Sequence, residues 1–163
     1  MAACESLRVV ITRMTAADID DVLLIEGQSF PTPWSRHAFQ REVGENIFAR
    51  YYVARKEGQV LGYAGMWLVV DEAHVTNIAI SPDYRRQGFG QVLMQYLIAQ
   101  AAQEGATYMT LEVRRGNHPA QSMYRGLGFR PVGTRKGYYS DTNEDAIIME
   151  KDLYQDDSGP EFA

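Results

Sequence analysis

The feature that most constrains this chain is the stretch over residues 75–93, VTNIAISPDYRRQGFGQVL. Its first part is an apolar, β-branched run that ends at SPD, which predicts a strand over residues 75–81. Beyond the glycines, apolar residues such as Leu93 and Leu97 recur at the spacing of one helical face. The chain is therefore expected to pass from a strand through a glycine loop directly into a helix.

The glycine loop is suited to bind an anion. Gly88 and Gly90 lack a Cβ, so the backbone can approach a ligand closely, and the helix that follows offers N–H groups and partial positive charge. An ordinary tight turn from strand to helix would use the same residues. No Gly-Lys-Ser/Thr follows the loop, so a P-loop is not indicated. Leu93 stands where the fingerprint of a dinucleotide-binding site requires a small residue, so such a site is not indicated either.

The run Arg85-x-x-Gly88-x-Gly90 resembles the pyrophosphate loop of the GNAT N-acetyltransferases, which bind acetyl-coenzyme A. Within that superfamily the chain is most similar to the RimI family, the bacterial ribosomal-protein N-terminal alanine acetyltransferases. The resemblance covers residues 9–153 and rests on four motifs that occur in the right order. These motifs are IAISPDYRRQGFG, LEVRRGNHPAQSMYRGLGF, GYY and EDAIIM.

The order of predicted elements indicates a mixed α/β fold. Strands are expected over residues 7–13, 48–56, 59–70, 75–81, 107–113, 129–139 and 145–153. Helices are expected to begin at the Thr15 capping box, at Ser35, at the glycine loop and at Asn117, and to end near Ser29, Val43, Gly105 and Gly128. The resemblance implies the GNAT fold, with a mostly antiparallel seven-stranded sheet, a central parallel strand pair and about four helices.

The central parallel pair, residues 75–81 and 107–113, is expected to open a crevice beyond its carboxyl ends, where ligands bind. In the GNAT fold these strands splay apart in a V, a bulge interrupts the first, and pantetheine inserts between them. By that resemblance, coenzyme A is bound by Ile78, Ala79, Ile80, Arg85, Arg86, Gln87, Gly88, Phe89, Gly90, Asn117 and Tyr124. Asn117 is equally well explained as a helix cap alone.

Two side chains are candidates for proton transfer. Strand alternation places Glu112 on the opposite face from Leu111 and Val113, where a carboxylate can act as a base. The alternative is a surface glutamate paired with an arginine, Arg114 or Arg86. Tyr124 follows Asn117 by two helical turns, and the resemblance assigns it the role of general acid toward the coenzyme A sulfur. A buried structural tyrosine is the alternative.

Aromatic residues are the candidates for binding the substrate that accepts the acetyl group. Phe30, Pro31 and Trp34 lie on a proline-stiffened segment that either closes the edge of the core or forms a substrate-binding wall. Tyr138 and Tyr139 match residues of the substrate groove in RimI proteins, although aromatic residues are common in any hairpin. The resemblance therefore predicts direct acetyl transfer to a protein N-terminus, with a ribosomal protein that begins with alanine as the partner.

Composition restricts the other possibilities. With 45% hydrophobic and 23% charged residues the chain is expected to be a soluble globule, a single domain over residues 1–154 followed by a disordered polar tail at residues 155–163. The net charge of −5 argues against nucleic-acid binding. We find neither a signal peptide nor a membrane span, which predicts a cytoplasmic protein. The single cysteine, Cys4, and three scattered histidines indicate no metal site and no acyl-cysteine route, and the oligomeric state stays open.

Two other functions stay open at this point. A GNAT enzyme that acetylates a small amine or a lysine side chain would share the same donor half. A non-catalytic acyl-coenzyme A sensor would keep the fold without the chemistry. The presence of Glu112 and Tyr124 favours an enzyme, and the aromatic residues Phe30, Trp34, Tyr138 and Tyr139 favour a peptide acceptor.

Overall fold

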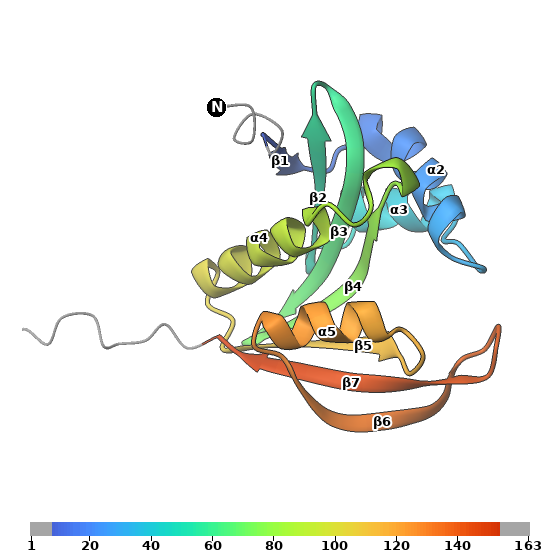
Figure 1. The fold of residues 1–163 in the computed structure, drawn as a ribbon. Helices are drawn as coiled ribbons and strands as arrows, with labels where there is room; N and C mark the ends of the chain where they lie inside the picture. Colours follow the sequence, from blue (N-terminus) through green and yellow to red (C-terminus); the bar gives the residue numbers. More distant parts are fainter. Residues whose placement is uncertain (1–7, 154–163) are drawn as a thin grey trace, which may run out of the picture. The chain divides into compact units, whose positions relative to one another are not determined.

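The computed structural model describes residues 8–153, and Figure 1 shows the order of its helices and strands. The chain divides into two compact units. One unit extends to Trp67 and includes Val75–Leu97, and the other comprises Leu68–His74 and the residues from Ile98 onward. The single domain over residues 1–154 stays a prediction. Cys4 and the expected tail at residues 155–163 lie outside the described residues.

The three helices predicted to begin in the first unit are present, with two 3₁₀ turns in addition. They are η1 (Ala16–Asp18), α2 (Ile19–Ser29), α3 (Arg36–Gly44) and η2 (Pro82–Tyr84), and α4 (Phe89–Gln103) begins in this unit. The capping box is formed, since the Thr15 backbone N–H donates to Asp18 Oδ2 at 2.8 Å. The Ser35 hydroxyl accepts a hydrogen bond from the Ala38 N–H at 3.2 Å and caps α3.

The strands of the first unit form an antiparallel arrangement. They are β1 (Val10–Arg13), β2 (Ala49–Lys56), β3 (Gln59–Val69) and the larger part of β4 (Glu72–Ile80). β1 pairs with β2, and β2 pairs with β3, in antiparallel register. The predicted hairpin between β2 and β3 is confirmed, because Glu57 and Gly58 both have positive φ, 52° and 81°, as a tight two-residue turn requires.

The core of the first unit is aromatic at its centre. Phe39 from α3 meets Tyr63 from β3 edge to face at 5.7 Å, and meets Tyr51 from β2 at 6.4 Å. Ile19 and Val22 of α2 are buried in the same cluster, so the helices cover these strands with their apolar faces. Such edge-to-face contacts stabilise a core by roughly 0.5–1.5 kcal/mol each beyond the area that they bury.

The second unit is built on a long hairpin. Its elements are β5 (Tyr108–Arg114), α5 (His118–Gly126), β6 (Arg130–Tyr139) and β7 (Glu144–Asp152). β7 pairs in antiparallel register with both β5 and β6, and β5 is parallel to the start of β4, where His74 lies opposite Thr110. The Gln121 amide of α5 donates to the carbonyl oxygens of Arg114 and Arg115 at 3.0 and 2.9 Å, which ties α5 to the end of β5.

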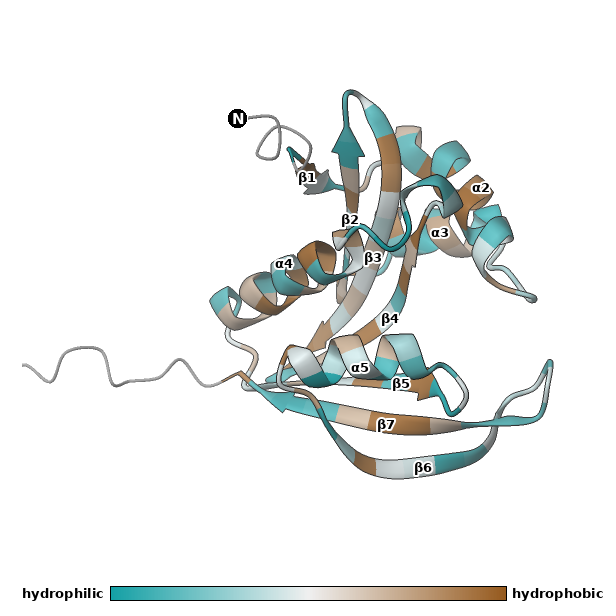
Figure 2. Ribbon diagram, in the orientation of Figure 1, coloured by the Kyte–Doolittle hydropathy of each residue, from teal (hydrophilic) through white to brown (hydrophobic). Residues whose placement is uncertain are grey.

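The strand order β1-β2-β3-β4-β5-β7-β6 gives the seven-stranded mixed sheet that the sequence predicts, with its parallel pair β4–β5. β6 is an edge strand and is exposed along most of its length, while Figure 2 shows a hydrophobic middle part in the neighbouring β7. The charged residues Arg130, Arg135 and Lys136 on this edge discourage further strand pairing. Within residues 8–153, no helix has both the length and the apolar character needed to span a membrane.

Several expected boundaries were wrong. β1 begins at Val10, although a strand over residues 7–13 was expected. β4 begins at Glu72 and not at residue 75, in a segment where the sequence indicated a turn. Its polar residues Glu72 and His74 alternate with the buried residues Ala73 and Val75, so the strand continues while only one of its faces is apolar. In addition, the capping box opens a 3₁₀ turn before the α-helix, as is common at helix starts.

Candidate active site

The glycine loop has the backbone of an anion site. Gly88 has a φ of +87° and Arg86 a φ of +63°, so the chain turns sharply before α4 begins at Phe89. A Cβ placed on Gly88 would meet no atom within 4 Å, which shows that the space over this backbone is open. The first N–H groups of α4 have no acceptor within their own helix. This arrangement fits a phosphate group, whose oxygens accept hydrogen bonds from such N–H groups.

Two side chains of the loop form hydrogen bonds with neighbouring residues and so stabilise its conformation. Arg85 Nε donates to the Ile80 carbonyl oxygen at 3.0 Å, and Arg85 Nη2 donates to Ser29 Oγ at 3.1 Å. Gln87 donates to the Asp83 carbonyl oxygen at 3.3 Å. The Phe89 side chain is buried, so only its backbone can face a ligand. Buried and partly buried residues alternate along β4 up to Ile80. The binding of coenzyme A by Ile78, Ala79 and Ile80 stays a prediction, and so does the bulge in this strand.

Glu112 lies in the second unit among charged neighbours. Leu111 and Val113 are buried on the opposite face of β5, so the predicted alternation is confirmed. Glu112 Oε2 lies 2.6 Å from His74 Nε2, and Glu112 Oε1 lies 3.9 Å from Arg135 Nε. Burial raises the pKa of Glu112, but the hydrogen bond from His74 and the charges of His74 and Arg135 outweigh it, and the net pKa is lowered.

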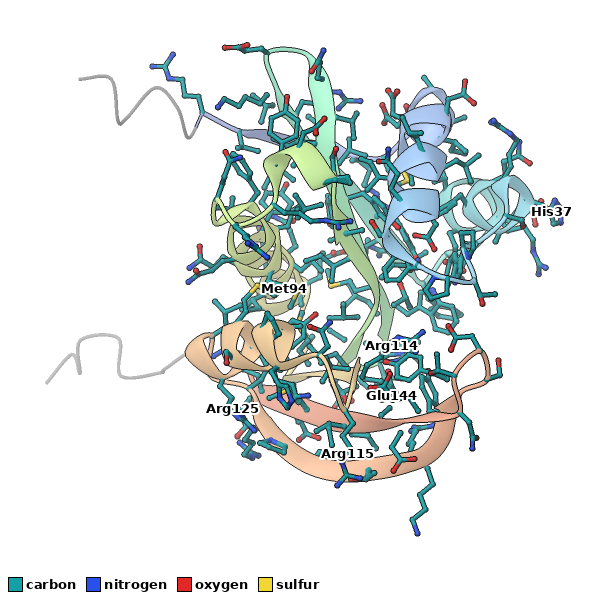
Figure 3. All side chains as sticks on the ribbon, turned by 45° about the vertical axis from the view of Figure 1, so that its right-hand side comes forward. His37, Met94, Arg114, Arg115, Arg125 and Glu144 are labelled. Carbon is teal, nitrogen blue, oxygen red and sulfur yellow. The ribbon has the colours of Figure 1, made fainter. Side chains whose placement is uncertain are left out.

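The suggested pairing of Glu112 with Arg114 was wrong. Arg114 binds two other carboxylates instead, with Nη2 at 2.8 Å from Asp141 Oδ2 and Nη1 at 3.5 Å from Glu144 Oε1. Figure 3 shows Arg114 and Glu144 side by side. The side chain of Arg114 points toward the β6–β7 hairpin because these acidic residues lie at the hairpin turn, and Glu112 faces His74.

Arg114 also orders the two tyrosines of the hairpin. Its guanidinium carbon lies 4.0 Å from the centre of the Tyr139 ring, a cation–π contact. The rings of Tyr138 and Tyr139 meet edge to face at 5.0 Å. Tyr138 is 45% exposed, whereas Tyr139 is partly covered, and burial raises the pKa of the Tyr139 phenol. One phenol is therefore held in place and the other is accessible.

Tyr124 is a buried phenol on α5. Only 5% of it is exposed, and its ring meets Phe129 edge to face at 5.8 Å. Burial raises the pKa of Tyr124 to about 12, so the hydroxyl keeps its proton at neutral pH and is able to donate it. Asn117 serves as the helix cap, since its Oδ1 accepts from the Ala120 N–H at 3.2 Å. A second role of Asn117 toward coenzyme A stays a prediction.

The segment from Phe30 to Trp34 is anchored to the core of the first unit. Trp34 packs 5.5 Å from Phe39 and 6.5 Å from Tyr51 between ring centres, which supports the interpretation as a core edge. Its backbone N–H donates to Glu26 Oε1 at 3.0 Å. Burial raises the pKa of Glu26 to about 7, against the effect of the hydrogen bonds from Trp34 and Asn77. Pro31 is exposed.

Trp34 also lines a groove on the surface of the first unit. The groove has a volume of about 680 Å³ and is lined by Trp34, Ala38, Arg41, Glu42, Glu45, Asn46 and Trp67. The indole N–H of Trp67 and the amide of Asn46 both donate to Glu42 Oε2, at 2.8 and 3.0 Å. Trp34 therefore packs against the core and also lines a surface groove, and its role in binding a substrate stays a prediction.

Sequence reasoning missed two titratable residues. His74 was noted only as one of three scattered histidines, yet it lies against Glu112. The register of the parallel pair would have revealed it, because His74 faces Thr110 and residues two apart on a strand share a face. Glu26 lay within an apolar stripe, and its burial at 2% exposure follows from that position. In residues 8–153, no cluster of three or more potential ligands is arranged to hold a metal ion.

Comparison with known proteins gives a consistent picture. Residues 19–129 match the model of the acetyltransferase (GNAT) family. An Escherichia coli K12 [ribosomal protein bS18]-alanine N-acetyltransferase is 36% identical over 85% of this chain and 94% of its own length. A Bacillus subtilis protein provisionally given the same name is 44% identical over 87% of this chain and 94% of its own length.

Solved structures agree with the fold described above. The crystal structure of the ribosomal-protein-S18-alanine N-acetyltransferase from E. coli has a TM-score of 0.82 and 34% identity, and the match covers 89% of this chain and 94% of that one. Ard1 from Thermoplasma volcanium has a TM-score of 0.81 at 24% identity, over 91% of this chain and all of that one, and supports the fold alone.

Proposed function

Because this chain belongs to the acetyltransferase (GNAT) family, we propose that it transfers the acetyl group of acetyl-coenzyme A to the N-terminal α-amine of a ribosomal protein that begins with alanine. The observation that carries this acceptor is the likeness to the E. coli bS18-alanine N-acetyltransferase over 94% of that protein's length. The second support is local, since a carboxylate that contacts a histidine and a phenol that carries a proton lie in one unit of the chain. A ribosomal substrate also implies a cytoplasmic enzyme.

On the donor side, the glycine loop binds the pyrophosphate of coenzyme A through backbone N–H groups. Gly88 keeps the space over the loop open, and Arg85 braces it against Ile80 and Ser29. The neighbouring residues Arg86, Gln87, Phe89 and Gly90 contribute backbone to the same turn. The backbone of Ile78, Ala79 and Ile80 and the side chain of Asn117 bind the pantetheine arm.

On the acceptor side, the reaction requires the removal and the delivery of a proton. An N-terminal amine has a pKa of about 7.7–8.0, so near neutral pH most of it is an ammonium that must lose a proton before it can attack. Glu112 is the base in this step. Tyr124 delivers a proton to the departing thiolate, because its burial keeps the phenol protonated. Acetyl transfer is direct, with both substrates bound at once.

The acceptor peptide is bound by aromatic residues. Trp34 presents one side to the surface groove, and Phe30 and Pro31 precede it. Tyr138 is exposed enough to hydrogen-bond a peptide backbone, and Tyr139 is held by Arg114. A groove of about 680 Å³ with two glutamates and one arginine suits a peptide with basic residues after its first one.

The test compares two peptides of the same sequence that begins with alanine and contains one internal lysine. In the first peptide the α-amine is free, and in the second it is already acetylated. We expect mass spectrometry to find acetylation of the first peptide at its α-amine and no reaction of the second. Equal rates for the two peptides would show that the chain is a lysine or small-amine acetyltransferase. No transfer to any amine, together with tight acetyl-coenzyme A binding, would show a sensor.

A further inference from the structure

His74 and Glu112 form a close pair that the proposed acid–base roles do not explain. They come from neighbouring parallel strands, with His74 on β4 and Glu112 on β5, on the same face of the sheet. The 2.6 Å separation of Nε2 and Oε2 is a hydrogen bond whenever one of these two atoms carries a proton. The two side chains are 29% and 10% exposed, so water does not fully screen their interaction.

Charged and titratable groups of the second unit surround this pair. Arg135 on β6 lies 3.9 Å from the other carboxylate oxygen. Tyr138 and Tyr139 lie near enough for the charge of Glu112 to raise the pKa of each phenol, in addition to burial. Arg114 is occupied by Asp141 and Glu144. His74 is therefore the neighbour that bonds Glu112 directly.

This environment is poor for a lone carboxylate base. The hydrogen bond and the positive charges that lower the pKa of Glu112 also lower its affinity for a proton. A carboxylate whose pKa lies below its usual value of about 4.3 is more than three units below an ammonium of about pKa 8, so the transfer is unfavourable by roughly 10³-fold or more. A base is most effective when its pKa lies near the operating pH, and histidine is the side chain that ordinarily titrates there.

We propose that His74 and Glu112 accept the ammonium proton as one coupled pair, in which His74 acts through Glu112 as a positioning and proton-sharing residue. This proposal rests on the proposed function, since it concerns the same reaction. When Glu112 is ionised, Nε2–H donates to Oε2, and the lone pair of the neutral ring is on Nδ1. Additional protons enter and leave the pair as a unit, so that neither residue has a pKa of its own.

The proton balance of the reaction is then complete. The ammonium loses one proton to the pair, which later releases it to water. The sulfur takes a proton from Tyr124, and the second proton that the nitrogen loses as the amide forms restores the phenol. Neither metal nor redox partner enters this scheme, and the new bond between nitrogen and the acetyl carbon replaces the carbon–sulfur bond.

The central experiment measures kcat/KM against pH for wild type and His74→Gln. Glutamine can still donate a hydrogen bond to Glu112 but cannot take a proton. The ratio of variant to wild-type kcat/KM isolates the part of the rate that depends on the base, since other effects of pH are common to both proteins. We expect the ratio to be lowest near pH 7.5, at least about tenfold below one. It should rise toward pH 9, where the amine is already free, and toward acidic pH, where a protonated pair can no longer accept a proton in wild type. A ratio that is the same at every pH would make His74 a structural residue and overturn the proposal.

The matched control and the double variant sharpen this test. His37→Gln changes an exposed histidine on α3, which Figure 3 shows on the surface, and should leave the profile unchanged. If the two residues act as a unit, the variant with both His74→Gln and Glu112→Gln should be no slower than Glu112→Gln alone. Multiplied losses in the double variant would show two independent residues and would contradict the pair.

A titration without substrates separates this inference from the proposed function. NMR of labelled histidine side chains should show that the pH midpoint of the coupled pair, followed at the His74 ring, differs between wild type and Glu112→Gln, because ring and carboxylate share protons. The same midpoint in both proteins would overturn the pair even if the enzyme is active. A shifted midpoint in a protein that fails to acetylate the free-amine peptide would refute the proposed function and keep the pair.

Discussion

A phenol as buried as Tyr124 is a poor acid in the resting protein, and it is useful because it still carries its proton when the thiolate departs. Burial raises its pKa to about 12, so the phenol stays protonated through the neutral and mildly alkaline range. Tyr124→Phe should therefore lower kcat by on the order of 10²-fold or more and leave acetyl-coenzyme A affinity nearly unchanged. Alkaline buffer should not restore the rate, since hydroxide cannot replace a proton donor. Single-turnover kinetics with calorimetric binding will measure both quantities.

A second tyrosine provides the control for this experiment. The Tyr63 hydroxyl is fully buried and has no hydrogen-bond partner in residues 8–153. Tyr63→Phe removes the same oxygen atom from the core of the first unit, where its loss should leave the stability unchanged or slightly raised. If Tyr124→Phe matched Tyr63→Phe in its single-turnover rate, Tyr124 would be a structural residue.

For single residues, the sequence predicted correctly on which face of a strand a side chain lies, but not the residue with which that side chain pairs. Glu112 was placed correctly because alternation along a strand is local and needs no knowledge of the neighbouring strand. Its partner His74 lies 38 residues earlier, and only the register between the strands brings the two together. The arginine nearest in sequence, Arg114, turned out to serve the hairpin carboxylates.

The glycine loop is the element whose backbone can be tested most directly. Gly88 has a φ of +87°, which a branched side chain tolerates poorly, and the open space over it is where the pyrophosphate is proposed to bind. Gly88→Val should therefore raise the dissociation constant of acetyl-coenzyme A, through the changed loop and the added methyl groups. Arg85→Ala should weaken binding less, because Arg85 braces the loop. Isothermal calorimetry checks both.

The effect of backbone strain in the Gly88→Val variant must be distinguished from the loss of the proposed pyrophosphate site. Gly105 has a φ of +95°, meets no atom within 4 Å at a built Cβ, and lies just beyond the opposite end of α4. Gly105→Val therefore carries a similar strain at a place where no phosphate is proposed to bind. Thermal unfolding should show comparable losses of stability in the two variants. Unchanged affinity in a folded Gly88→Val protein would refute the assignment of the loop.

Elements with strong end signals were predicted most accurately. Ser35, Asn117 and the Thr15 box mark helix starts that the structure confirms, because capping hydrogen bonds form within a few residues of one another. The start of β4 was missed because its outer face is polar, so that apolar residues alone understate its length. Whether a strand extends through such a stretch depends on the neighbour with which it pairs, here β5.

The stability of the whole molecule should depend on pH through Glu26. Its pKa is about 7 in the folded protein and near 4.5 in the unfolded chain, so only the unfolded chain loses this proton readily between those values. Ionisation of the unfolded chain then favours unfolding, and the stability that Glu26 contributes below pH 4.5 is lost as the pH rises to 7. The change amounts to at most about 3 kcal/mol.

Glu26→Gln replaces the ionisable carboxyl group by an amide, whose oxygen can still accept the hydrogen bond from the Trp34 N–H. Relative to wild type, the variant should become more stable as the pH is raised from 5 to 8, which urea unfolding at several pH values will measure. Glu45→Gln, on the surface of α3, should leave the pH dependence unchanged because its ion pair with Arg41 is exposed. A stability difference between Glu26→Gln and wild type that is constant over this range would contradict the raised pKa.

For the molecule as a whole, the family could be recognised from sequence because four motifs occur in one order over most of the chain. Family membership was confirmed by comparison, and the seven-stranded mixed sheet with its parallel pair was confirmed by the structure. The groove beside Trp34 could not be foreseen, since its walls combine α3 with the end of β3, whose Trp67 is distant in sequence.

That groove has a practical consequence for spectroscopy. The chain contains two tryptophans, Trp34 and Trp67, and both line it. Indole emission shifts with the polarity of its surroundings, so nearly all the intrinsic fluorescence of this protein originates at the walls of a single depression. A peptide that settles there would change the emission of an otherwise unlabelled sample, and a titration in an ordinary fluorimeter would follow acceptor binding before any acetyl group has moved.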